Sequence, residues 1–173
     1  MGQDYTKHNL LFISKYPQII HEFTDAMKDR DIEIETAING IEAAAKIKKK
    51  NYDIVITGLS LEGYNGEQII TYLNKTAPST VCIIYTTTIS SAQLHFFINE
   101  RNVFRVFLRP VDFRGAFWEA LEEAYEYHAV QVKNEEDTGA RRQEQEKNSI
   151  VDDASIALIL PALNYIGENY KEI

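Results

Sequence analysis

Short apolar runs alternate with longer stretches of helical periodicity over the first 130 residues, and this alternation strongly constrains the fold. The apolar or alternating runs predict five strands, at residues 9–13, 32–36, 54–56, 81–85 and 106–108. Between them, apolar residues recur every three or four positions, which is typical of amphipathic helices. Strands that are buried on both faces of a parallel sheet read as nearly continuous apolar runs. The sequence therefore predicts an α/β fold with a doubly wound, five-stranded parallel sheet.

Five helices are predicted, each after a residue that suits a helix start. Proline is tolerated in the first turn, and Asn, Ser and Asp side chains accept hydrogen bonds from the first free amides. Such residues are Pro17, Asn39, Ser90 or Ser91, and Asp112, while the third helix follows the turn marked by Gly63, Asn65 and Gly66. The fifth helix is expected to begin directly after Asp112, with Phe113 on its apolar face.

The composition changes after about residue 130, where a nearly all-polar stretch begins. We expect four parts: an N-terminal tail (1–7), a compact domain (8–130), a polar linker or helix extension (131–149) and an amphipathic C-terminal helix (150–173). The apolar residues of the last part are spaced by three and four, at Ile156, Ile159, Leu163, Ile166 and Tyr170. This spacing is the seam of an amphipathic or coiled-coil helix, and it favours a homodimer formed through the C-terminal helices.

Charge and composition argue against several classes of partner. The net charge is −8, whereas proteins that bind nucleic acid or anionic membranes usually carry a basic surface. No run approaches the roughly 20 apolar residues of a membrane span, and the N-terminus has no apolar signal-peptide core. A single cysteine gives no sign of an oxidising compartment, so we expect a cytoplasmic protein. No metal-ligand spacing is present among the histidines, His8, His21, His95 and His128.

Over about residues 8–130 the chain resembles the receiver domains of response regulators, the CheY-like family. The resemblance is carried by the segments 11–17, 52–66, 83–87 and 106–112, in the order and spacing of the family. It implies a flavodoxin-like fold and a role in two-component signal transduction, of the kind that uses phosphorelay.

The residues that carry the chemistry of this family are changed. In receiver domains two adjacent acids after the first strand and an aspartate after the third hold Mg²⁺, and that aspartate accepts the phosphoryl group. Here the acids are replaced by Ser14 and Lys15, the acceptor by Gly58 and the conserved lysine by Arg109, while the hydroxyl residue, Thr86, is kept. The resemblance therefore implies a pseudo-receiver with no catalytic residue, metal or cofactor.

Three interpretations of the residues at this vacated phosphorylation site remain open. Ser14, Lys15, Thr86 and Arg109 could form an anion site, because two cations and two hydroxyls suit a phosphate or carboxylate. Lys15 could instead supply the charge of the missing metal, or the pocket could be a relic in which Lys15 points to water. The leading hypothesis is a non-enzymatic signalling module that acts through protein contacts. The alternative is a sensor of anions or small ligands.

Residues 162–173 are similar to the opening helix of AraC-type DNA-binding domains. No recognition helix follows, so we expect no direct DNA binding by this chain. The segment could be a free-standing helix, or the start of a truncated output domain, in which case the chain is the receiver part of a transcription regulator.

Overall fold

The computed structural model describes residues 8–148. The expected tail (1–7), the expected C-terminal helix (150–173) and the stretch that resembles AraC-type domains lie outside the described residues. Among the described residues, no helix combines the length and the apolar character that a membrane crossing requires.

A single parallel sheet of five strands forms the centre of the fold, in the order β2-β1-β3-β4-β5. The strands are β1 (His8–Ile13), β2 (Ile32–Ala37), β3 (Ile54–Thr57), β4 (Val81–Thr86) and β5 (Val103–Leu108). The order reverses between β1 and β3, which is the place where doubly wound folds bind ligands. The doubly wound α/β fold predicted from the sequence is confirmed.

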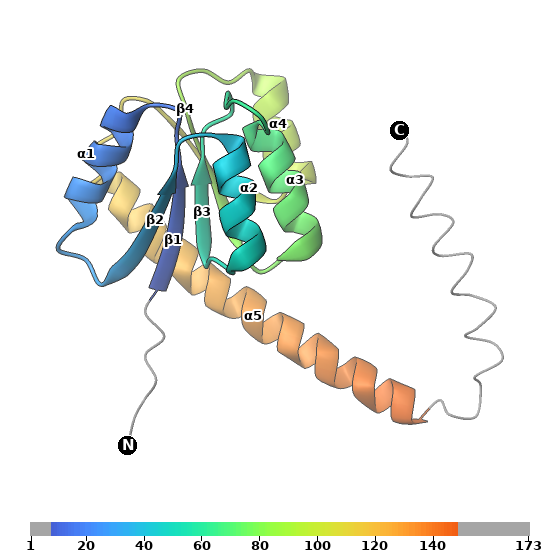
Figure 1. The fold of residues 1–173 in the computed structure, drawn as a ribbon. Helices are drawn as coiled ribbons and strands as arrows, with labels where there is room; N and C mark the ends of the chain where they lie inside the picture. Colours follow the sequence, from blue (N-terminus) through green and yellow to red (C-terminus); the bar gives the residue numbers. More distant parts are fainter. Residues whose placement is uncertain (1–7, 149–173) are drawn as a thin grey trace. The chain divides into compact units, whose positions relative to one another are not determined.

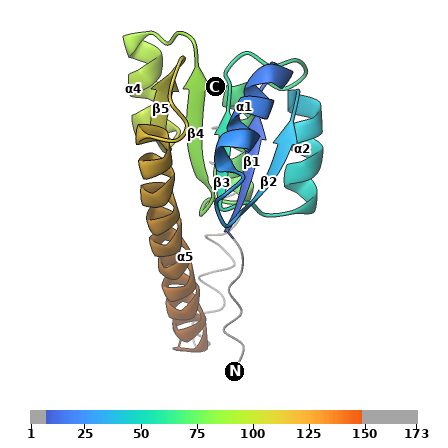
Figure 2. The ribbon, with the colours of Figure 1, turned by 90° about the vertical axis from the view of Figure 1, so that its left-hand side faces the viewer.

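Helices cover both faces of the sheet (Figures 1 and 2). They are α1 (Pro17–Met27), α2 (Gly40–Lys49), α3 (Gly66–Thr76), α4 (Ser91–Glu100) and α5 (Ala116–Asn148). One layer of core joins the sheet to α1 and the first turns of α5 around Phe12, Phe23 and Phe117. The other joins it to α2, α3 and α4. Strands covered on both faces explain why β3 and β4 are fully buried and apolar in sequence.

Helix α5 begins later than the sequence predicted. The prediction that Asp112 caps this helix was therefore wrong. The side chain of Asp112 accepts a hydrogen bond from the Arg114 amide (3.0 Å), and its carbonyl accepts one from the Gly115 amide (3.3 Å). These bonds close a turn ahead of the helix, and Phe113 enters the core from that turn. Helix α5 then starts at Ala116 and continues through the polar stretch to Asn148.

Candidate functional site

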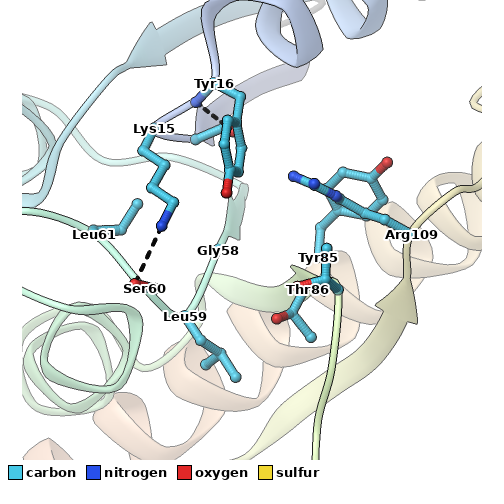
Figure 3. Close-up of a pocket in the computed structure, with 11 residues that line it drawn as sticks. Lys15, Tyr16, Gly58, Leu59, Ser60, Leu61, Tyr85, Thr86 and Arg109 are labelled. Atoms are coloured by element: carbon cyan, nitrogen blue, oxygen red, sulfur yellow. Dashed lines mark hydrogen bonds between the residues drawn. The ribbon is translucent and has the colours of Figure 1, made fainter.

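A small pocket lies at the carboxyl ends of β1, β3, β4 and β5 (Figure 3). Its volume is about 60 Å³, and since one water takes about 30 Å³ in the liquid, it has room only for a small ligand. The residues that line it include Ser14, Lys15 and Tyr16 after β1, Gly58 and Ser60 after β3, Tyr85 and Thr86 at the end of β4, and Arg109 after β5.

All four residues predicted to form an anion site line this one pocket, together with Gly58. The strand register explains the gathering: Ile13 pairs with Thr57, Thr57 with Ile84, and Thr86 with Leu108. Side chains that directly follow these aligned strand ends meet at one edge of the sheet.

Lys15 reaches across the front of the pocket from the loop after β1 to the loop after β3 (Figure 3). Its Nζ donates a long hydrogen bond of 3.4 Å to the Ser60 hydroxyl and lies 5.3 Å from the centroid of the Tyr16 ring. The lysine is therefore tied to the loop that contains Gly58, although its side chain is exposed.

Arg109 is held by two aromatic rings. Its guanidinium group lies 4.6 Å from the ring centroid of Tyr16 and 5.9 Å from that of Tyr85. Its amide donates a hydrogen bond of 2.8 Å to the carbonyl of Thr86, and the peptide bond to Pro110 is cis. Burial raises the pKa of Tyr85, and the nearby charge of Arg109 offsets part of this rise.

Sequence reasoning missed the two tyrosines. Tyr16 follows Lys15 directly, and Tyr85 precedes Thr86 at the end of β4, so their positions beside predicted site residues were the available signal. Tyr85 also packs against Phe113 and Phe117 in the core, and an apolar pattern alone does not distinguish core packing from pocket lining.

Gly58 stands at the floor of the pocket. A Cβ atom placed on it would have its nearest neighbour, the Tyr85 carbonyl oxygen, 3.7 Å away, so a Cβ atom fits there without a clash. The two hydroxyl residues are buried and already make local bonds. Ser14 Oγ accepts a bond from the Tyr16 amide (3.2 Å), and Thr86 Oγ1 donates to the Thr88 carbonyl (3.2 Å).

The pocket is electropositive in an otherwise acidic chain. Its lining residues include two cations, Lys15 and Arg109, and no carboxylate. Mg²⁺ needs hard oxygen ligands, usually carboxylates, and a fixed cation opposes a second one, so the residues present do not fit this metal. Elsewhere in residues 8–148, no cluster of His, Cys, Asp and Glu side chains could hold a metal ion. The arrangement suits a small anion instead.

Comparisons with known proteins agree with the fold. The sequence profile of the response regulator receiver domain matches residues 11–115. Among solved structures, the signal receiver domain of an HD domain-containing protein from Pseudomonas fluorescens Pf-5 is 19% identical, with a TM-score of 0.67, over 72% of this chain and 98% of that one. A CheY-like receiver domain protein from Methanospirillum hungatei JF-1 is 18% identical, with a TM-score of 0.66, over 72% and 99% of the two chains. No curated protein matched in sequence.

Proposed function

The chain belongs to the response regulator receiver domain family, and from this we propose that it is a receiver-like signalling module that takes no phosphoryl group and acts through contacts with partner proteins. It carries out no catalysis in this proposal. One observation carries the proposal: Gly58, which has no side chain, directly follows β3 in the pocket, where the family places its acceptor aspartate.

The charges around Gly58 support the same conclusion. Transfer to an aspartate in this family depends on Mg²⁺ held by carboxylates, and the pocket offers Ser14 and Lys15 in place of the acidic pair. A cation that is fixed beside the glycine opposes the approach of the metal. The acceptor and the metal ligands are therefore lost together, as expected for a module whose state does not depend on phosphorylation.

Intact-mass measurement after incubation with acetyl phosphate and Mg²⁺ tests the proposal. We expect no added phosphoryl group on the chain. The matched control is the variant Ser14→Asp/Lys15→Asp/Gly58→Asp, which restores the carboxylates. A stoichiometric, base-labile gain of one phosphoryl group on the unmodified chain overturns the proposal.

A homodimer that forms through residues 150–173 belongs to the same proposal, although that segment lies outside the described residues. Its apolar residues are spaced by three and four, which suits two equivalent helices. Light scattering of the full chain and of a chain that ends at residue 149 tests this part. We expect the full chain to be a dimer and the shortened chain a monomer. A monomeric full chain contradicts it.

A second candidate function, a sensor of small anions, is favoured by the two cations and the absence of carboxylates in the pocket lining. Calorimetry with inorganic phosphate, in the absence of Mg²⁺, measures the binding of an anion directly. Lys15→Met and Arg109→Met should each weaken binding by about tenfold, since a hydrogen bond to a charged group is worth about 1.5–3 kcal/mol. Lys28→Met on α1 is the control, and an equal loss in this variant removes the pocket from consideration.

A further inference from the structure

A groove runs along the outer surface between α2 and α3, which lie side by side in Figure 1. It consists of two hollows, of about 360 and 150 Å³, that share Lys48 and Tyr72. It extends from Tyr64, just before α3, to Thr80, just beyond it. We call it the α2–α3 groove.

The lining of the larger hollow is largely apolar and aromatic. Ala44 on α2 lines it together with Tyr64, Ile69 and Tyr72. Both tyrosines remain exposed, by 48% and 37%, and Ile41, one turn before Ala44, is 62% exposed. Apolar surface grouped in this way on a helix pair marks a site of interaction.

The charges of the groove are opposite to those of the chain. The chain carries 26 acidic and 18 basic side chains, yet the groove is lined by Lys48 and Lys50 and by no carboxylate. Lys50 is already paired with Glu33 and Glu35. Lys48 makes no hydrogen bond or ion pair with any residue of the part that the structure describes. An unpaired lysine beside exposed tyrosines suits a partner that is both apolar and acidic.

We propose that the α2–α3 groove binds an acidic amphipathic helix of a partner protein. The length of the groove suits a short helix. It runs along α3, which has 11 residues and is roughly 16 Å long at 1.5 Å per residue, so it accepts about three turns of a helix. The partner presents apolar residues at i, i+3, i+4 and i+7 to Tyr64 and Tyr72, and a flanking carboxylate to Lys48. Symmetric groove-to-groove pairing of two copies would bring their lysines together, which disfavours that mode of binding.

Two synthetic peptides provide the test with the full-length chain. The first, of about 12 residues, carries Leu at the four apolar positions and Glu at the flanking ones, and its twin carries Lys in place of each Glu. Both are labelled with fluorescein and titrated by fluorescence anisotropy. We expect the Glu peptide to bind about tenfold more tightly than the Lys peptide, which corresponds to one charge-assisted contact.

Variants of the chain show whether the peptides bind in the α2–α3 groove. Lys48→Glu should abolish or reverse the preference for the Glu peptide, and Tyr72→Ala should weaken both peptides. Lys28→Glu, just after the end of α1, is the matched control, and it should keep the preference of the unmodified chain. Circular dichroism verifies that each variant is folded.

Three results of the peptide titrations would overturn the proposal. They are no binding of the Glu peptide up to about 1 mM, equal binding of the two peptides, and an unchanged preference in Lys48→Glu. A change of oligomeric state in Lys48→Glu, measured by light scattering, would also overturn it, because the groove would then be an interface between copies of this chain.

Discussion

Gly66 packs directly against the carbonyl group of Gly58. A Cβ atom on Gly66 would lie 2.2 Å from the Gly58 carbonyl oxygen, a separation that real Cβ atoms essentially never show. The Gly66 amide also donates a hydrogen bond of 3.0 Å to the Leu59 carbonyl. The first residue of α3 therefore closes the loop that forms the floor of the pocket.

Alanine substitutions at these two glycines should differ in their effect on stability. Gly66→Ala forces the loop and the helix apart, and we expect it to lower the free energy of unfolding by about 1–3 kcal/mol. At Gly58 the nearest atom to a new Cβ is 3.7 Å away, so Gly58→Ala should stay within about 0.5 kcal/mol of the original chain. Urea denaturation measures both, and equal losses would contradict the role given to Gly66.

Restoring the acceptor alone should not restore the metal site. A Cβ atom on Gly58 meets no atom closer than 3.7 Å, but Gly58→Asp leaves Lys15 in the pocket lining, with its Nζ bonded to Ser60. We expect no measurable Mg²⁺ binding by calorimetry for Gly58→Asp, and binding only when Ser14 and Lys15 are also changed to Asp. Mg²⁺ binding by the single variant that equals that of the triple variant would show that Lys15 does not exclude the metal.

The sequence predicted the sheet and the residues of the pocket well, for one physical reason. Buried parallel strands read as apolar runs, and the residues that directly follow them must meet at one edge of the sheet. The resemblance to receiver domains picked out Lys15, Gly58 and Arg109, and the strand pattern predicted that they meet at this edge. Tyr16 and Tyr85 were not, because the pattern of apolar residues does not reveal which ring faces a cation.

The ends of the fifth helix were harder to predict. Asp112 has the chemistry of a helix cap, but its side chain closes a separate turn, and both arrangements use the same hydrogen bonds. After residue 130 no apolar stripe marks a helix, so a linker and a helix extension both fitted the sequence. Residues 133–148 are helical, as the high intrinsic helix propensity of their Glu, Gln, Lys and Arg residues allows.

Cys82 should be chemically inert in the folded protein. It lies in β4 with 1% of its surface exposed, and burial raises the pKa of its thiol to about 12. Because the thiolate is the reactive form, we expect no modification by a maleimide under native conditions and complete modification in urea. Rapid labelling of the native protein, measured by intact mass, would contradict the burial of this residue.

Asp53, just before β3, is joined to α5 by His128. The Nε2 atom of His128 lies 3.1 Å from a carboxylate oxygen of Asp53, and its Nδ1 atom lies 2.8 Å from the Ser79 carbonyl oxygen. Both neighbours are acceptors, so the imidazole can donate to both only when it is protonated. Burial alone would raise the pKa of Asp53, but the hydrogen bonds from His128 and the Asn9 amide outweigh it and hold this pKa below its usual range.

The lowered pKa of Asp53 predicts how stability changes with pH. Its ionised form is favoured in the folded chain, so the stability it contributes is fully present above its unfolded pKa of about 3.9 and is lost as the pH falls through the folded pKa. Asp53→Asn should therefore lose stability relative to the original chain at about pH 7, and the two should converge at about pH 2. Urea denaturation across this range measures the difference. Asp29→Asn, at an exposed carboxyl, is the control and should follow the original chain. If the difference in the free energy of unfolding between Asp53→Asn and the original chain stays constant with pH, Asp53 acts through packing rather than through its charge.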